Sequence, residues 1–225
     1  MLLLPLATAC TGNAKDSAGP SACHGAAERC DLPLDQVAIA MTHNGMSNAD
    51  EGWLGPNQTH DIDQQLADGV RGLMLDVHPW EDEAYLCHGY CDLGAERLAD
   101  GLARIGRFHA DNPYEVVVLM LENHVDPAWI ATAAEEAGVA ELAHVQTTGA
   151  AWPTLRELGD AGTPLVVFSQ DEGEGVPWIH AGYRDHVWDT PYAAQEAEDF
   201  SCERLRGDTT HPFFLVNHFL TRPTA

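Results

Sequence analysis

Side chains that can exchange protons or bind ions follow several short apolar runs in the sequence. In chain order they are Thr42-His43-Asn44, Asp76, His78, His88, Glu122-Asn123-His124 and Gln170-Asp171-Glu172. The carboxyl ends of parallel strands meet at one mouth of a sheet or barrel, so residues that follow such strands gather there. One such residue would be ordinary, but four or five together predict a functional site.

Two of these histidines suit acid–base chemistry. An imidazole takes up and releases protons near neutral pH, so His43 and His88 could each transfer one proton. Asn44, Asp76 and Glu122 offer only oxygen ligands, which suit Ca²⁺ or Mg²⁺ better than zinc. Such a set could cleave a phosphodiester: one imidazole activates a hydroxyl, the other protonates the leaving oxygen, and the cation stabilises the charge at phosphorus.

The elements that must position these residues are short apolar runs alternating with helical patterns. Runs rich in Val, Ile and Leu without polar alternation are typical of parallel strands covered on both faces. Strands are predicted at 37–41, 72–77, 115–121, 165–169, 186–188 and 213–216, with a weak one near 144–146, and helices at 61–68, 94–110, 127–137 and 152–160. This alternation predicts a parallel α/β fold, with a TIM-like (β/α) barrel favoured over an open sheet.

The composition fits one globular domain. Apolar residues make up 45% of the 225-residue chain and charged residues 20%. Eleven Lys and Arg against 35 Asp and Glu give a formal net charge of −24, which argues against nucleic-acid binding because phosphates must be met by cations. Strong electrostatic adhesion to anionic lipid is disfavoured for the same reason. No apolar run approaches the ~20 residues that cross a bilayer.

The first residues are predicted to be a targeting segment. We assign residues 1–22 to a signal remnant and tether, and residues 23–225 to the catalytic domain. Met1–Ala9 is apolar and ends in small residues before Cys10, like the end of a bacterial lipoprotein signal. It lacks a basic region, so an upstream start and a degenerate signal both stay open. We expect a secreted or cell-envelope protein with a lipid anchor at Cys10.

Four cysteines lie in two close pairs, Cys23 with Cys30 and Cys87 with Cys91. Each pair can close locally in an oxidising compartment. Zinc is the competing interpretation of CHGYC, but the spacing matches no closed zinc site well. We therefore predict two disulfides, which leaves Cys202 without a partner.

The ordered motifs resemble the X domain of phosphatidylinositol-specific phospholipase C, in the secreted single-domain branch of the PLC-like phosphodiesterases. The matching segments are THNGMS (42–47), QQLADGVRGLMLDVH (64–78), LCHGYC (86–91), NPYEVVVLMLENH (112–124), WPTLREL (152–158) and LVVFSQ (165–170). Single motifs such as THN mean little, but their order and spacing over roughly residues 23–220 are highly specific.

The resemblance implies a TIM-like barrel and a phosphoric diester hydrolase, with phosphatidylinositol as the first substrate to consider. It makes His43 the general base on the inositol 2-hydroxyl and His88 the general acid toward the diacylglycerol oxygen, through a cyclic phosphodiester. Asn44, Asp76 and Glu122 fall where the metal-dependent members place calcium ligands. A phospholipid substrate also implies peripheral contact with a membrane, and we expect a monomer.

Three features near this motif set need separate expectations. Met74 stands where the calcium-dependent phospholipases carry a fourth acidic ligand, and a thioether is a poor partner for a hard ion, so any Ca²⁺ site is weakened. Arg71 precedes the second strand and is expected to order the barrel mouth rather than to touch phosphate. A further strand usually follows the one that resembles Phe213–Phe219, so we expect a barrel that lacks its last strand.

Two other functions stay open. The substrate could be another glycerophosphodiester or a sphingolipid, because one barrel supports many chemistries. The chain could also be a non-catalytic surface lipoprotein that binds inositol or sugar, although such a protein has no need for two titrating histidines. Among the remaining polar residues, His78 and His124 are evenly balanced between structural and functional roles, and Asp171 and Glu172 are expected in a solvated loop.

Overall fold

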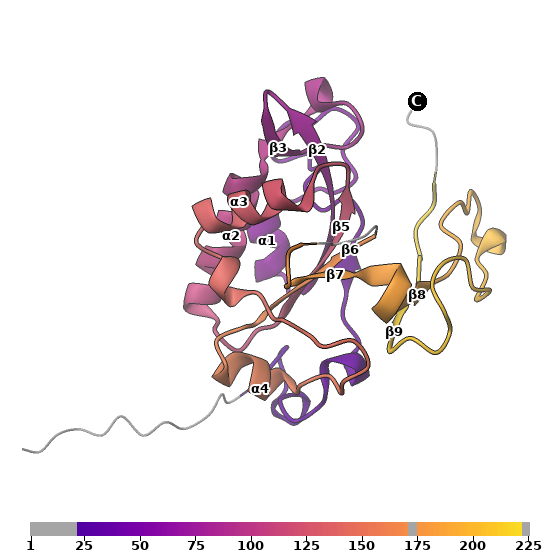
Figure 1. Cartoon of the computed structure of the whole chain (residues 1–225). Helices are drawn as coiled ribbons and strands as arrows, with labels where there is room; N and C mark the ends of the chain where they lie inside the picture. Colours follow the sequence, from indigo (N-terminus) through magenta and orange to yellow (C-terminus); the bar gives the residue numbers. More distant parts are fainter. Residues whose placement is uncertain (1–21, 171–174, 222–225) are drawn as a thin grey trace, which may run out of the picture.

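A seven-stranded sheet organises most of the protein (Figure 1). The computed structural model describes residues 22–170 and 175–221. The strands are β1 (Met41–Thr42), β2 (Gly72–Trp80), β3 (Glu83–Leu86), β4 (Glu96–Arg97), β5 (Val117–Asn123), β6 (Leu165–Ser169) and β7 (Ile179–Ala181). The order is β4-β3-β2-β5-β6-β7, and β1 also pairs with β2. The β1–β2, β2–β5, β5–β6 and β6–β7 pairs are parallel, which confirms the parallel α/β prediction.

A second, smaller sheet stands beside the first in Figure 1 and consists of β8 (Val187–Asp189) and β9 (Phe213–Leu215), which pair in parallel. A π-helical turn, Gly182–His186, connects β7 to β8. Among the described residues, no backbone ladder joins the two sheets or joins β9 to β1. The second sheet is therefore held in place by this short connection and by side-chain contacts.

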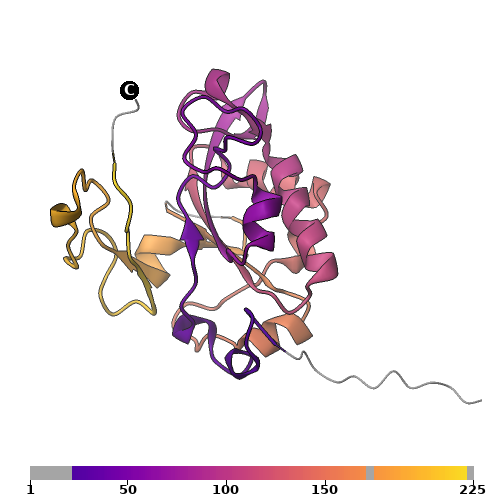
Figure 2. The same ribbon diagram turned by 180° about the vertical axis from the view of Figure 1, so that it is seen from behind.

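Helices α1 (Ile62–Ala67), α2 (Leu98–Asp111) and α3 (Pro127–Glu136) cover one face of the main sheet (Figures 1 and 2). Helix α4 (Leu155–Asp160) lies apart from them, and its Leu155 and Leu158 pack in the core of the opposite face. Single 3-10 turns occur at Ala27–Arg29, Leu34–Gln36, Cys91–Leu93, Ala140–Leu142 and Ala197–Asp199. Asp61 and Asp126 accept a backbone hydrogen bond at the first turns of α1 and α3, as N-cap residues do. Within the described residues, no helix has the length and hydropathy needed to cross a bilayer.

Successive residues of a strand point to opposite faces, and this rule separates two cores. On the helix-covered face lie Leu73, Leu75, Leu119 and Val167. On the opposite face lie Met74, Val118, Met120, Val166 and Phe168, together with Val187 of β8. The second face is the interior onto which the second sheet packs, and it is the face that carries the polar strand ends.

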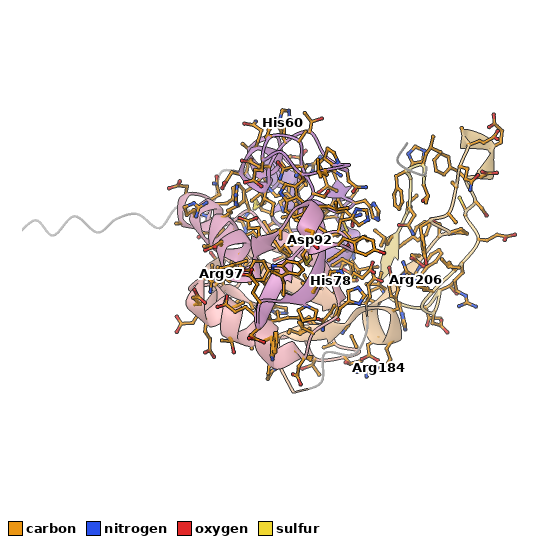
Figure 3. All side chains as sticks on the ribbon, turned by 90° about the horizontal axis from the view of Figure 1, so that it is seen from above. His60, His78, Asp92, Arg97, Arg184 and Arg206 are labelled. Carbon is orange, nitrogen blue, oxygen red and sulfur yellow. A yellow bond between two sulfur atoms is a disulfide. The ribbon has the colours of Figure 1, made fainter. Side chains whose placement is uncertain are left out.

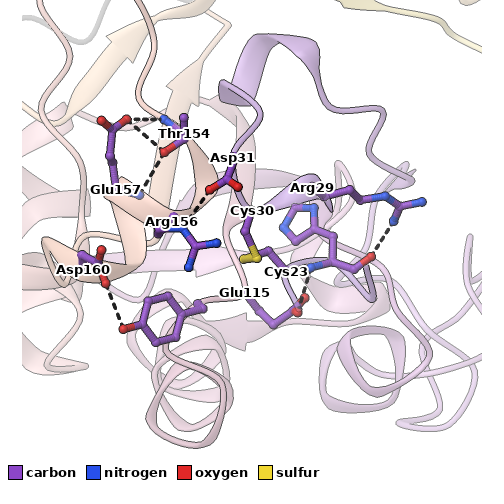
Figure 4. The surroundings of a disulfide bond; sticks show 11 residues. Cys23, Arg29, Cys30, Asp31, Glu115, Thr154, Arg156, Glu157 and Asp160 are labelled. Carbon is purple, nitrogen blue, oxygen red and sulfur yellow. Dashed lines mark hydrogen bonds and ion pairs between the residues drawn. A yellow bond between two sulfur atoms is a disulfide. The ribbon is translucent and has the colours of Figure 1, made fainter. Parts of the chain in front are cut away.

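The amino-terminal segment is closed on itself by a disulfide and is tied to the main body by polar contacts (Figure 4). Cys23 and Cys30 are bonded, which confirms the first predicted pair. The His24 backbone N–H donates to Glu115 Oε1 at 2.9 Å, and Arg156 Nε binds Asp31 Oδ1 at 2.8 Å. These contacts join the chain before β1 to the segment before β5 and to α4.

Several predicted boundaries were wrong. The run at 37–41 contributes only Met41 to a strand, and the predicted strand near 144–146 is reduced to a bridge between Ala143 and Leu165. The helix predicted at 152–160 begins at Leu155, because Thr154 and Glu157 form a capping box. The β3–β4 hairpin arm and β7 were missed, since both are short and carry polar residues. The predicted tether and lipid anchor fall on residues 1–21, outside the described residues.

Candidate active site

Polar side chains form a row across three neighbouring strands at their carboxyl ends. Asp76 of β2 is the register partner of Glu122 of β5. Gln170 follows β6 and continues the β5–β6 register, in which Leu121 pairs with Ser169. One row toward the amino end, the same face carries Met74, Met120 and Phe168. The site therefore has polar walls on an apolar floor.

Asp76 is the most buried acid of this row. It is 5% exposed, and its Oδ1 has no hydrogen-bond partner among the described residues. Burial raises the pKa of Asp76 to about 7, and the nearby charge of Glu122 raises it further in the same direction. The Asp76 carboxyl group thus has no hydrogen-bond donor at Oδ1 that would stabilise its ionised form.

His43 follows β1 and lies at the edge of this row. Asn44 next to it is buried and has a positive φ of 49°, which asparagine tolerates better than most residues. Gly45 N–H donates to the Met74 carbonyl at 2.9 Å, which holds this loop against β2. Burial lowers the pKa of His43 to about 4, and the charge that His88 would carry lowers it too, while Glu122 raises it. His43 is therefore a neutral imidazole at pH 7.

His88 lies on an exposed loop after β3, within electrostatic reach of His43 and His78. Cys87 and Cys91 on either side of it form the second predicted disulfide. The Cys87 N–H donates to the Asp76 carbonyl at 3.3 Å, so the loop is attached directly to the strand that carries Asp76. Free Cys202 is exposed elsewhere. The short closed loop restricts where the His88 imidazole can lie.

His78 and His124 form a second imidazole pair above the acid row. Their rings stack at 4.2 Å with an interplanar angle of 20°, and His124 Nε2 lies 3.2 Å from Glu122 Oε1. Burial lowers the pKa of His78, and the charge of His124 lowers it too. The structure thus places His78 and His124, for which structural and functional roles were equally expected, beside the acids of the site.

A cavity of about 560 Å³ opens beside His43 between the two sheets. Its walls include Met74, Met120 and Phe168 from the main sheet, and Phe213 and Asn217 from the second. Phe219 stacks on the His43 ring at 4.0 Å with an interplanar angle of 14°. One side of the candidate base is thus covered by the segment that follows β9.

Arg71 is not part of this assembly. It precedes β2, at the amino end of the sheet, where its Nε binds Glu115 Oε2 at 2.5 Å and its guanidinium lies 4.6 Å from the Phe108 ring centroid. It also donates to the carbonyls of Leu66 and Val70. Arg71 therefore stabilises the amino end of the sheet, whereas it was expected at the mouth, which is the carboxyl end.

An arginine that the sequence analysis missed lies at the mouth instead. Arg206 donates from Nε and Nη2 to Asp189 Oδ2, at 3.0 and 2.5 Å, and from Nη1 to Gln170 Oε1 at 3.0 Å. Its guanidinium lies 4.1 Å from the ring of Tyr183 and 4.9 Å from that of Tyr192. Figure 3 shows Arg206 on the side of the second sheet, across from His78. In the sequence, the one indication of this arginine–carboxylate pair is that Asp189 follows the apolar run predicted at 186–188.

This arginine should stabilise the second sheet. In Arg206→Ala, the fully buried Asp189 carboxylate loses its cation, so we expect a loss of about 3–5 kcal/mol in the free energy of unfolding. Adding Asp189→Asn should recover part of the loss, and Arg107→Ala, which removes a well-exposed arginine, should change stability little. Urea unfolding at pH 7 measures all three. Equal losses for Arg206→Ala and Arg107→Ala would contradict this role.

A hard cation fits the donor chemistry of the site, although few protein ligands would hold it. Asn44, Asp76 and Glu122 supply oxygen atoms, and the orphaned Asp76 Oδ1 is the kind of atom that a cation satisfies. Met74 occupies the floor where a fourth carboxylate would help. Within the described parts of the chain, His, Cys, Asp and Glu side chains do not gather in threes around a possible ion.

Comparisons with known proteins agree with this architecture. Residues 29–224 match the PI-PLC X family model. PI-PLC X domain-containing protein At5g67130 of Arabidopsis thaliana is 31% identical over 215 residues, 85% of this chain and 50% of that protein. An uncharacterized secreted protein of Arthroderma benhamiae is 29% identical over 214 residues, 88% of this chain and 48% of that protein.

The chain thus spans about half the length of these two relatives. Among solved structures, the phosphatidylinositol-specific phospholipase C from Listeria monocytogenes superposes with a TM-score of 0.53 at 19% identity, over 72% of this chain and 65% of that one. This similarity confirms the predicted fold class, an α/β fold of the phospholipase barrel type.

Proposed function

Because the chain belongs to the PI-PLC X family, we propose that it is a phosphoric diester hydrolase that cleaves phosphatidylinositol by the phospholipase C reaction. One observation carries this proposal: His43 lies within electrostatic reach of both His88 and Glu122, and Glu122 is the register partner of Asp76 at the carboxyl ends of the strands. Two imidazoles from separate loops beside two carboxylates are the groups that a phosphodiester cleavage needs.

In the proposed reaction His43 is the general base. Its low pKa leaves the imidazole unprotonated at pH 7, so it can accept the proton of the inositol 2-hydroxyl. The 2-oxygen then attacks phosphorus, and the bond from phosphorus to the glycerol oxygen breaks to give a cyclic inositol phosphate. His88 on its exposed loop donates the proton that the departing diacylglycerol oxygen takes up. The charge of Glu122 favours the imidazolium that forms on His43.

The phosphate charge must also be balanced in a chain of net charge −24. We propose that Asn44, Asp76 and Glu122 would hold a Ca²⁺ ion for this purpose. The ion would supply positive charge that stabilises the phosphoryl oxygens during attack. Ionised Asp76, which the fold disfavours, would be stabilised by the same ion.

Apolar side chains at the rim support a membrane-bound substrate. Tyr90 lies two residues after His88 and is 76% exposed. Leu54 and Leu93 are 67% and 44% exposed, and the Leu54 N–H donates to the Leu93 carbonyl at 2.8 Å, which fixes their two loops together. Exposed apolar residues grouped beside a site are typical of contact with other molecules or membranes. We propose peripheral contact with the membrane through this rim.

The two disulfides agree with an extracellular location, as does the secreted relative in Arthroderma benhamiae. We further propose that Cys10 carries a lipid anchor, which would hold the enzyme near its substrate. Mass spectrometry of the protein purified from membranes of the producing cell would detect a diacylglyceryl group on Cys10 or show its absence.

The direct test is ³¹P NMR of phosphatidylinositol micelles incubated with the protein, first with Ca²⁺ and then with chelator. A cyclic inositol phosphate signal that requires Ca²⁺ would support the reaction and the cation. The same signal in chelator would support the reaction and contradict the cation. If neither phosphatidylinositol nor a glycerophosphodiester nor a sphingolipid yields product, the hydrolase proposal is wrong, and inositol binding becomes the function to test.

A further inference from the structure

A cluster of aromatic and imidazole rings joins the two sheets below the site. It contains Trp152 before α4, Phe168 of β6, His180 of β7, His186 at the end of the π-helical turn, and Phe213 of β9. The rings of Trp152 and Phe213 lie 4.8 Å apart, those of Phe168 and Phe213 5.4 Å, and those of His180 and His186 5.5 Å. The cluster therefore places two histidines inside the contact between the sheets.

Both histidines are buried in a neutral state. His180 is 5% exposed and His186 is 3% exposed. His180 Nε2 lies 3.0 Å from the His144 carbonyl, whereas the contacts of the His186 ring among the described residues are aromatic. Burial lowers the pKa of both imidazoles, and it brings that of His186 to about 4. The fold thus resists protonation at both positions.

Little negative charge is available to stabilise a proton there. His144 faces His180 from the loop before α4, and its charge would oppose protonation. Around His186, the charges of His180, His211 and Arg184 oppose protonation, and only Asp185 favours it. Asp185 is itself paired with Arg184 at 3.1 Å. A protonated His186 would meet three cationic or potentially cationic neighbours and one shared carboxylate.

The second sheet depends on these side chains for its position. It has no backbone ladder to the main sheet among the described residues. Besides the ring cluster, its contacts include the Arg206–Gln170 hydrogen bond and the stack of Phe219 on His43. The cavity of about 560 Å³ separates it from β1. Loss of the ring contacts would free the segment that covers His43.

We propose that His180 and His186 form an acid-sensitive latch, which releases the β8–β9 sheet from the main sheet when the pH falls. Release would carry Phe219 away from His43 and open the cavity beside it. The latch goes beyond the proposed hydrolase activity and does not depend on it. Its basis is proton linkage: the open state, in which the imidazoles are exposed, binds protons more tightly than the closed state. A fall in pH therefore favours the open state.

The size of the effect follows from proton linkage. If His186 has an ordinary pKa of 6.5 in the open state and about 4 in the closed state, the ratio of open to closed molecules rises about 20-fold between pH 7 and pH 5. The lowered pKa of His180 acts in the same direction. Above pH 7 both histidines are neutral in either state, and the latch stays closed.

Pulsed electron paramagnetic resonance can measure the opening on the full chain. One spin label goes on native Cys202, which is exposed on the side of the second sheet, and one on Glu135→Cys, an exposed position of α3, in a Cys10→Ser background. We expect one distance distribution at pH 7 and a second, longer population at pH 5. In His180→Gln/His186→Gln the distribution should be the same at both pH values, and His60→Gln, at an exposed histidine, should behave like the parent.

Two results would overturn the latch: an unchanged distribution in the parent protein at pH 5, or a response that survives in the double glutamine variant. If that variant does not fold, ¹³C NMR titration of the imidazoles in the parent protein decides instead. A His186 titration below pH 5 that coincides with loss of the ring-current shifts of Phe213 supports the latch. A midpoint near 6.5 without any change in those shifts contradicts it.

Discussion

Replacement of His43 or His88 by alanine should lower the rate of phosphatidylinositol cleavage about 10²–10⁴-fold, the range that a general acid or base contributes. His43 should be needed for every substrate, because it activates the attacking hydroxyl. His88 should matter less when the leaving oxygen is a stable aryloxide, since such a group departs without a proton. Initial rates on the natural lipid and on an aryl phosphodiester of inositol separate the two roles.

The pH profile gives a second check on these roles. The His43 imidazole has a pKa of about 4, so it stays unprotonated when the pH falls through 6.5. Protonation of His43 should therefore lower the rate only at a pH well below 6.5. His60→Ala is the matched control, because His60 is exposed and pairs with Asp50. Rates for His43→Ala and His88→Ala that match those of His60→Ala would contradict the acid–base mechanism.

Replacement of Asp76 by asparagine should stabilise the protein at alkaline pH. The carboxyl of Asp76 has a pKa of about 7 in the fold against an ordinary 3.8, chiefly because burial penalises the charged form. Folding therefore holds a proton that the unfolded chain releases, and stability falls as the pH rises from about 4 to 7. Ionisation costs on the order of 4 kcal/mol by pH 8, and asparagine avoids that cost because it carries no charge.

Urea unfolding at pH 4.5 and pH 8 measures this effect. The advantage of Asp76→Asn should be large at pH 8 and small at pH 4.5, whereas Asp92→Asn, at an exposed carboxylate, should change stability little at either pH. An advantage that is equal at both pH values would show that the buried charge is not its cause. Added Ca²⁺ should raise the midpoint of the parent protein and leave that of Asp76→Asn unchanged, and phosphodiester cleavage by the variant should be lost.

Taken together, these two results would describe a trade-off at one residue. Asp76 costs stability because its Oδ1 has no partner and its neighbour Glu122 is also acidic. A destabilising carboxyl group of this kind is typical of functional sites. A carboxylate whose oxygen atoms all accept hydrogen bonds from the protein has no free oxygen with which to bind an ion. The apolar floor of Met74, Met120 and Phe168 maintains the low-polarity surroundings that produce the shift.

The sequence by itself determined the three central strands of the sheet and which of their ends are polar. β2, β5 and β6 were predicted because buried parallel strands read as unbroken apolar runs, and Asp76 and Glu122 stand at the ends of those runs. The disulfides Cys23–Cys30 and Cys87–Cys91 were predictable because each pair is close in the chain. All of these are local patterns, set by a few neighbouring residues.

The tertiary structure alone decided which distant groups meet. Phe219 covers His43 from 176 positions away, and Arg206 reaches Gln170 across 36, through side chains that no periodicity marks. Arg71 lies at the other end of the sheet, because its position before β2 fixes the end at which it emerges. Hydrophobic periodicity reports which face of an element is buried, whereas the partners across a cavity depend on sheet order and on how the second sheet docks.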